Sequence, residues 1–387
     1  MKALNGKTIR IAFAGGGSGG HIYPIIAVAA AIQEQASASG VDVRLHYYGD
    51  GAGGRFRKNI EGQGIKFHRI LTSKLRRYLS LLNVVDAVKL PFGIIQALFK
   101  LYALMPDVVF SKGGPGAFPV VLAAWFYKIP VMIHESDVTP GLTTLLTARF
   151  ARKIGISFES ATKYFDPKKV VLAGNPVRRE LLVGRLPKDE AKRALGFDPA
   201  KPLLLVMGGS QGARKLNEFI VLNLGSILPV AQILHQTGPD NFVETKKLAE
   251  AGLVELPASA STESRYEPVA YFADSVFGRN ALSAADLVFG RAGSSTIFEA
   301  AAFGKPMILV PPGSGAADHQ RENAEAVAAA GAGIVIEEAN LTGRIFMAEL
   351  KRLFADPAAL AALGQAAANF AKPDAAVTLA AAVLALV

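Results

Sequence analysis

The sequence predicts an α/β protein with two domains, each a doubly wound parallel sheet covered by helices. Three observations support this prediction. The chain has 387 residues, more than one ordinary domain needs. Short apolar runs alternate with helical stretches, a pattern typical of parallel sheets with helices on both faces. A strand, a glycine-rich turn and a helix start occur near the N-terminus and again near mid-chain.

The expected strands fall into two groups. The first group is Ile9–Ala14, Val43–Gly49, Asp107–Ser111, Val131–His134, Lys153–Ser157 and Val170–Ala173. The second group is Leu203–Met207, Gln232–Gln236, Leu287–Gly290, Met307–Val310 and Gly333–Glu337. The charged, proline-containing segment Leu186–Pro202 is the expected linker. We therefore expect an N-terminal domain over 1–185, a C-terminal domain over 186–370, and a final helix over 371–387 that returns to the N-terminal domain.

Composition and charge narrow the class of protein. The chain has no cysteine, which excludes disulfides and thiolate metal sites and indicates a cytosolic compartment. No signal peptide is visible. Residues 1–180 carry 24 Lys and Arg against 11 Asp and Glu, whereas residues 181–387 carry 18 against 21. The N-terminal half is therefore expected to face a lipid surface or a phosphorylated substrate. Nucleic acid is disfavoured because basic patches interleaved with aromatic residues are missing.

The first glycine loop, residues 15–20, follows an apolar strand and leads to His21. Glycines let backbone N–H groups approach a ligand closely, and a helix that starts near Ile22 would favour an anion at its N-terminus. The loop also fits a dinucleotide-binding pattern with Asp42 downstream, but a single match is weak. A plain turn capped by Ser18 is the alternative. His21 could bind a ligand or accept a proton.

Two further loops come from the second half of the chain. The loop over residues 208–213 offers N–H groups and the Ser210 hydroxyl at a helix start, which favours a diphosphate, with a structural turn as the alternative. Residues 291–299 place a glycine and three hydroxyls before an apolar helix, and capping by Ser295 or Thr296 would explain the hydroxyls without a ligand. Glu299 on that helix could accept hydrogen bonds from a ribose diol, since a buried carboxylate needs partners.

Other candidates are polar side chains near strand ends. Gln320 and Asn323 are three residues apart and share a helix face, which suits sugar hydroxyls, although a polar helix start is the simpler explanation. Arg178 follows a strand and could bind phosphate or a base edge, or it could be a solvated arginine. The six histidines are scattered and no Asp-x-Asp pair occurs, so no metal site is expected. Charge stabilisation would then depend on helix ends and side chains.

Residues 75–105 are unusually apolar for a surface element. A transmembrane helix needs about 20 consecutive apolar residues, and this segment is interrupted by Asp86, Lys89, Pro91 and Lys100. It could form a pair of core helices. It could also form a membrane-surface patch whose apolar side chains are flanked by basic ones. The basic N-terminal half slightly favours the membrane.

Taken in order, the motifs resemble the MurG family of peripheral glycosyltransferases. The matching segments are GGGSGGHIYP at 15–24, KLRRY at 74–78, SKGG at 111–114, IPVMIHES at 129–136, GNPVR at 174–178, GGSQGA at 208–213, QTG at 236–238, GRAGSSTIFE at 290–299 and DHQRENA at 318–324. The resemblance covers nearly the whole chain. It implies a GT-B fold, in which two Rossmann-like domains face each other across a cleft.

The resemblance also implies an activity and its partners. The family moves N-acetylglucosamine from UDP-GlcNAc to an undecaprenyl-pyrophosphoryl-muramoylpentapeptide during peptidoglycan synthesis, with inversion, without a metal and without a cofactor. The implied partners are UDP-GlcNAc, a polyprenyl-pyrophosphate-linked muramyl peptide, an anionic membrane surface and other cell-wall synthesis proteins, but no nucleic acid. The implied location is peripheral, on the cytoplasmic face of the cell membrane.

Positional matches assign roles to residues. The expected general base is His21, ahead of Glu135, and Ser18, Gly19 and Gly20 would meet the lipid acceptor. The residues expected to bind the UDP-sugar are Asp137, Arg178, Ser210, Gln211, Gly212, Phe272, Gly293, Ser294, Thr296, Glu299, Gln320 and Asn323. Among these, the loop at Ser210 would hold the diphosphate, Arg178 the nucleotide, Glu299 the ribose, the Phe272 backbone the uracil, and Gln320 and Asn323 the sugar.

The chain departs from the family at two points. Asp137 stands where the family usually has Asn, so its charge must be paired, neutralised or displaced. Gly113-Gly114-Pro115 replaces the usual Gly-Gly-Tyr. Three other functions remain open: a related transferase with another lipid acceptor, a UDP-GlcNAc epimerase, and a non-catalytic scaffold subunit of an envelope-synthesis complex.

Overall fold

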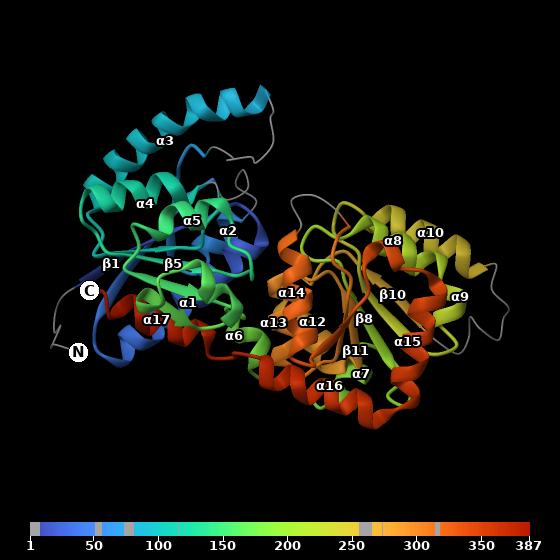
Figure 1. Cartoon of the computed structure of the whole chain (residues 1–387). Helices are drawn as coiled ribbons and strands as arrows, with labels where there is room; N and C mark the ends of the chain where they lie inside the picture. The colour runs from blue at the N-terminus through green and yellow to red at the C-terminus, as the bar shows by residue number, and fades with distance from the viewer. Residues whose placement is uncertain are drawn as a thin grey trace. The chain divides into compact units, whose positions relative to one another are not determined.

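A computed structural model describes residues 8–50, 56–72, 81–114, 116–254, 265–272, 274–313 and 318–387. The chain divides into two compact units (Figure 1). The N-terminal unit comprises Met1–Arg178 and Lys372–Val387, and the C-terminal unit comprises Arg179–Ala371. The KLRRY motif at 74–78 and Pro115 lie outside the described residues.

The N-terminal unit is built on a seven-stranded sheet in the order β3-β2-β1-β4-β5-β6-β7. All neighbouring strands in it are parallel. The strand order reverses between β1 and β4, and ligands of such sheets bind at the carboxyl ends of the strands near this switch point. The strands are β1 (Thr8–Ala14), β2 (Asp42–Gly49), β3 (Ile65–Arg69), β4 (Val108–Ser111), β5 (Val131–Glu135), β6 (Lys153–Ile156) and β7 (Val170–Leu172).

Helices cover both faces of this sheet because side chains alternate along each strand. Ile11 and Phe13 of β1 pack with α1 (Gly19–Ala38) and with α17 (Ala375–Leu384), so the end of the chain belongs to the core of this unit. Ala12 and Ala14 face a second cluster that includes α3 (Leu81–Leu104) and α4 (Ala117–Phe126). The short elements are α2 (Arg57–Glu61), α5 (Leu142–Ala148), η1 (Glu159–Tyr164) and η2 (Pro167–Lys169).

The C-terminal unit repeats this plan with a six-stranded parallel sheet in the order β10-β9-β8-β11-β12-β13. Its switch point lies between β8 and β11. The strands are β8 (Leu203–Met207), β9 (Gln232–Gln236), β10 (Tyr266–Val269), β11 (Leu287–Gly290), β12 (Met307–Leu309) and β13 (Gly333–Val335). The helices are α6 (Arg179–Leu182), α7 (Lys188–Ala194), α8 (Arg214–Leu222), α9 (Leu224–Ile227), α10 (Phe242–Val254), α12 (Ser275–Ala284), α13 (Ser294–Ala302), α14 (Asp318–Ala329), η3 (Glu338–Asn340), α15 (Gly343–Ala355) and α16 (Pro357–Phe370).

Two parallel-sheet, Rossmann-like units confirm the predicted fold class, and each expected strand is observed to within two residues of its predicted ends. The sequence analysis missed β3 and β10, which are edge strands. β3 mixes polar and apolar residues, and β10 contains Pro268, which a sheet tolerates at its edge. The expected linker also contains α7, whose Lys192 is buried and pairs with Asp286.

Candidate functional site

In the N-terminal unit, loops from three adjacent strands meet at the carboxyl edge of the sheet. They follow β1, β4 and β5. The first glycine loop and the loop over Lys112–Gly114 touch closely, because a Cβ on Gly114 would lie 2.9 Å from the Gly16 Cα. Gly114 also has a φ of +82°, which L side chains rarely adopt. Glycine at both positions therefore lets the two loops contact each other beside His21.

Ser18 holds the ring of His21. Its Oγ lies 2.8 Å from His21 Nδ1, and the carbonyl of Ser18 accepts the backbone N–H of His21 at 3.0 Å. Helix α1 begins at Gly19, before the expected start near Ile22, with Ser18 at its N-cap position. The Ser18 side chain makes no capping hydrogen bond there. The alternative explanation of Ser18 as a helix cap is therefore wrong, and its hydroxyl orients an imidazole instead.

His21 is neutral at physiological pH. Burial and then the positive charge of Lys112 lower the pKa of His21 to about 4. A neutral imidazole can accept a proton, although a pKa near the working pH would make it a better base. An anion bound nearby would raise this pKa, because it stabilises the charged ring.

The sequence analysis assigned no role to Lys112, which lies at the centre of this group. Its side chain is only 3% exposed and its ammonium donates to Ser136 Oγ. Burial lowers the pKa of Lys112, while the charges of Glu135 and Asp137 raise it. The positive charge of Lys112 thus opposes the negative charges of both carboxylates, including that of the unusual Asp137. The signal in the sequence was a lysine directly between an apolar strand and two glycines.

Glu135 braces the loop that follows β5. Its Oε1 accepts the N–H groups of Ser136 at 2.8 Å and Asp137 at 3.1 Å, and its Oε2 accepts that of Gly141 at 3.2 Å. Burial and then the charge of Asp137 raise the pKa of Glu135, against the opposing effect of Lys112. A carboxylate held by three backbone donors is poorly placed to move protons. The geometry therefore favours His21 over Glu135 as the base.

Arg178 lies in the N-terminal unit, after β7. Its guanidinium carbon is 4.7 Å from the centre of the Tyr23 ring, a cation–π contact. Tyr23 follows His21 by two residues on α1. Arg178 thus packs against α1, the helix that begins at the first glycine loop. Arg178 is therefore not simply a solvated arginine.

In the C-terminal unit, the second glycine loop packs on the loop after β9. The N–H of Gly212 donates to the Gly209 carbonyl at 3.0 Å, and Gln236 Nε2 donates to the same carbonyl at 3.0 Å. A Cβ on Gly212 would lie 2.0 Å from the Thr237 oxygen, whereas a Cβ on Gly209 would meet nothing within 4 Å. One side of this loop is therefore tightly packed and the other is open. Ser210 is partly exposed and Gln211 is exposed.

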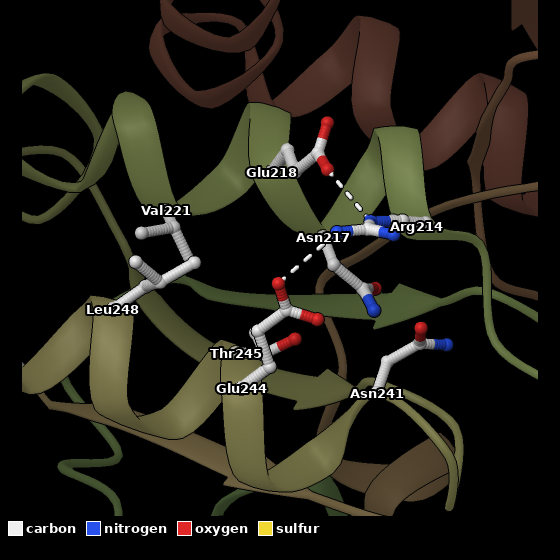
Figure 2. Close-up of a pocket in the computed structure, with 8 residues that line it drawn as sticks. All are labelled: Arg214, Asn217, Glu218, Val221, Asn241, Glu244, Thr245 and Leu248. Carbon is white, nitrogen blue, oxygen red and sulfur yellow. Dashed lines mark hydrogen bonds and ion pairs between the residues drawn. The ribbon is translucent and has the colours of Figure 1, made fainter.

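A small pocket between α8 and α10 lies behind this loop (Figure 2). Arg214 pairs with Glu218 at 3.0 Å and with Glu244 at 3.1 Å. Asn217 donates to the Thr237 carbonyl at 2.8 Å. Because its arginine is already neutralised by two carboxylates, the pocket supports the loop from behind and does not offer charge to an anion.

The third loop leads into α13 without a side-chain cap. Gly293 occupies the N-cap position of that helix, so Ser295 and Thr296 lie in its first turn and neither is the N-cap residue. A Cβ on Gly293 would meet nothing within 4 Å, so the helix start is open. Ser294 and Thr296 are buried in the first turn. Glu299 is partly exposed, so its carboxylate can be solvated and burial alone does not require it to bind a ribose diol.

The two amides of α14 differ in their surroundings. Asn323 is fully buried and donates to the Ala292 carbonyl at 3.1 Å, next to the start of α13. Gln320 is partly exposed, and its Oε1 has no hydrogen-bond partner among the described residues. Asn323 therefore holds the third loop in place, whereas Gln320 keeps an acceptor for a ligand.

Phe272 lies beyond the end of β10, at the carboxyl edge of the six-stranded sheet. Its side chain is buried, and its ring centre is 5.6 Å from that of Phe277.

In the described part of the chain, no cluster of three or more His, Asp or Glu side chains is arranged to hold a metal ion. The described helices also include none that is long and apolar enough to cross a membrane.

Both units match models of known domains. Residues 11–156 match the glycosyltransferase family 28 N-terminal domain, and residues 203–379 match the glycosyltransferase family 28 C-terminal domain. A UDP-N-acetylglucosamine–N-acetylmuramyl-(pentapeptide) pyrophosphoryl-undecaprenol N-acetylglucosamine transferase from Bacillus cereus is 36% identical over 89% of this chain and 91% of its own. The transferase of the same name from Legionella pneumophila is 35% identical over 88% of each chain.

Solved structures show the same architecture. The crystal structure of Acinetobacter baumannii MurG has a TM-score of 0.71 and 25% identity, over 98% of this chain and 99% of that one. A UDP-GlcNAc 2-epimerase from Neisseria meningitidis, bound to UDP-GlcNAc, has a TM-score of 0.66 over 98% of this chain and 100% of that one. At 15% identity the second likeness concerns the fold alone.

Proposed function

The chain belongs to the MurG family within glycosyltransferase family 28, and we propose that it transfers N-acetylglucosamine from UDP-GlcNAc to undecaprenyl-pyrophosphoryl-muramoylpentapeptide. The observation that carries this proposal is that relatives named for this reaction align over about nine-tenths of both chains. The protein is accordingly a hexosyltransferase.

The C-terminal unit is the proposed donor site. The open side of the second glycine loop and the uncapped start of α13 offer backbone N–H groups to a diphosphate. Ser210 and Gln211 would hold the phosphates, whereas the N–H of Gly212 already donates to the Gly209 carbonyl and shapes the loop. The proposed contacts to the sugar are Gly293, Ser294, Thr296 and Gln320. Glu299 would bind the ribose hydroxyls, and the Phe272 backbone would bind uracil. Asn323 would act on the sugar through the loop that it holds.

The N-terminal unit is the proposed acceptor site and the source of the base. An acceptor hydroxyl attacks the anomeric carbon, the bond from that carbon to the diphosphate oxygen breaks, and UDP leaves from the opposite face with inversion. His21 takes the hydroxyl proton. The anionic diphosphates raise the pKa of His21 from about 4 toward the working pH. In the C-terminal unit Ser210 stabilises the charge on the leaving group, and in the N-terminal unit the positive charge of Lys112 opposes that of Asp137.

The exposed face of α3 is the proposed membrane contact. Its exposed apolar side chains recur every three or four residues and so share one face of the helix; they are Val88, Phe92, Ile95, Phe99 and Tyr102. Gly93, Ala97 and Leu101 are buried on the opposite side of the same helix. Residues 81–104 thus form one helix and not the expected pair of core helices; where its side chains are described, one side is core and the other is apolar surface.

Aromatic contacts extend this apolar surface onto α4. The rings of Tyr102 and Tyr127 lie 6.1 Å apart, and the Tyr127 ring is 5.1 Å from that of Phe126, which is 64% exposed. With Lys89 exposed beside them, these residues suit an anionic membrane surface. We propose that the protein lies peripherally on the cytoplasmic face, where a lipid-linked acceptor and a nucleotide sugar are both accessible. Cosedimentation with anionic vesicles, lost in Phe92→Ser with Phe99→Ser, tests the contact.

The reaction itself is tested with purified protein, labelled UDP-GlcNAc and a set of lipid acceptors. We expect label to move to a polyprenyl-pyrophosphoryl muramyl peptide and not to diacylglycerol. UDP-glucose and UDP-galactose should be poorer donors than UDP-GlcNAc. A preference for another donor would contradict the proposal, and release of no UDP with any acceptor would favour a scaffold protein.

A further inference from the structure

We propose that Glu338, at the start of η3, is a positioning residue for the UDP-sugar because it joins two loops of the donor site. This inference rests on the proposed function. Glu338 was not among the residues that the sequence indicated, and it follows β13, a strand that supplies no residue to the donor site above. Its effect on the ligand is therefore exerted through other residues.

Three donors converge on the Glu338 carboxylate. Oε1 accepts from the Arg291 guanidinium. Oε2 accepts the backbone N–H of Gly313 at 3.1 Å and the ammonium of Lys215 at 2.9 Å. The carboxylate is only 12% exposed. The hydrogen bonds from Lys215, Arg291 and Gly313 outweigh the effect of burial and lower the pKa of Glu338 to about 2. Glu338 is therefore charged at every pH at which the enzyme works.

Two of these donors lie next to segments that the proposed function assigns to the donor sugar. Arg291 directly precedes Ala292 and Gly293, the residues that lead into α13. Its guanidinium also donates to the Val310 carbonyl at 3.1 Å, so it bridges the ends of β11 and β12. Gly313 lies in the segment after β12 that leads to α14 and Gln320. Glu338 thus links the loop that carries Gly293 to the loop that precedes Gln320.

The third donor matters less. The Lys215 side chain is 71% exposed, and exposed ion pairs contribute little because water screens them. Arg291 is only 13% exposed, so its pairing with Glu338 is the stronger contact. A glutamine at 338 would keep one acceptor for Gly313 but would lose the charge that holds Arg291. The two loops should then separate without loss of the unit's core.

Glu338→Gln tests this inference. Titration calorimetry of UDP-GlcNAc binding and steady-state transfer kinetics are measured on the wild type and the variant. We expect the dissociation constant and KM for UDP-GlcNAc to rise about tenfold, as for the loss of a hydrogen bond between charged groups. We expect kcat to change less than twofold, because Glu338 touches no reacting atom. Glu349→Gln, which removes a carboxylate paired with Arg352 on α15, should leave all three values unchanged.

The outcomes separate this inference from the proposed function. A wild type that binds UDP-GlcNAc but transfers nothing contradicts the function, while the binding comparison still decides the role of Glu338. A purely structural Glu338 would lower kcat and the melting temperature together and leave KM unchanged, which would overturn the inference. Equal affinity of wild type and Glu338→Gln would overturn it too. A wild type that does not bind UDP-GlcNAc contradicts both.

Discussion

The Ser18 hydroxyl lies 2.8 Å from Nδ1 of His21, three residues along the chain. The hydroxyl fixes one nitrogen of the ring, while the other nitrogen faces Gly114, where a Cβ would approach it to 3.2 Å. A glycine at 114 thus leaves room at Nε2. We infer that Ser18 orients His21 so that Nε2 is the atom that accepts the proton.

Replacing Ser18 and His21 singly and together tests this relationship. His21→Ala should lower kcat at least 100-fold, the usual range for a lost general base being about 10²–10⁴. Ser18→Ala should lower it about tenfold, with little change in melting temperature, because Ser18 does not cap the helix. In the double variant the Ser18 change should have no further effect. Additive losses would show that the hydroxyl acts independently of His21.

The pH dependence of the reaction should reflect the low pKa of His21. In the free protein the ring is protonated only near pH 4, so kcat/KM should keep its acid limb well below the ordinary value of 6.5. The bound diphosphates raise this pKa, so the acid limb of kcat should lie at higher pH than that of kcat/KM. Rate profiles between pH 4 and 9 check this order. Coincident limbs at pH 6.5 would contradict it.

Two histidines with lowered pKa values should also make the fold sensitive to acid. Burial lowers the pKa of His235 to about 3 and, with nearby positive charges, that of His68 to about 4. The unfolded chain therefore binds more protons than the folded one as pH falls below 6.5. Stability should be complete above pH 6.5 and should decline from there toward pH 4. Urea midpoints across this range should fall less steeply for His235→Gln, and a pH-independent midpoint would contradict the argument.

The central strands could be predicted from sequence because buried parallel strands are continuous apolar runs. β3 was not predicted because it mixes polar and apolar residues, and β10 because it contains Pro268; the other two edge strands, β7 and β13, are apolar runs and were predicted. The glycine loops were recognisable because their backbone geometry limits the choice of residue. Lys112 and Glu338 were not, since their importance comes from contacts with Ser136 and Arg291, which only the folded chain brings close.

Lys112→Met should show how much the charge of the unusual Asp137 lowers the free energy of unfolding. Without the ammonium, the repulsion between the charges of Glu135 and Asp137 is no longer opposed by Lys112, which should lower the free energy of unfolding by about 3 kcal/mol. Adding Asp137→Asn to this variant should recover part of the loss, because it removes one of the two negative charges. Urea unfolding of the two single variants and the double variant provides the measurement. Strictly additive losses would show that Lys112 and Asp137 do not interact.

Two glycines of the second loop form a matched pair. Gly209 and Gly212 both have positive φ, +83° and +78°, so alanine at either costs about 1 kcal/mol of backbone strain. Only at 212 would the new Cβ also collide with the Thr237 carbonyl. Gly212→Ala should therefore lower the melting temperature clearly more than Gly209→Ala. Equal shifts in melting temperature would mean that the loops after β8 and β9 can move apart without loss of stability.

The most direct test of the central claim is transfer of labelled N-acetylglucosamine from UDP-GlcNAc to a polyprenyl-pyrophosphoryl muramyl-pentapeptide by the purified protein. We predict one inverted glycosidic linkage and one UDP released for each acceptor consumed, with kcat lowered at least 100-fold in His21→Ala. Transfer to a different lipid acceptor, with none to the muramyl peptide, would contradict the proposed reaction. Full activity in His21→Ala would contradict the role of His21 as the general base.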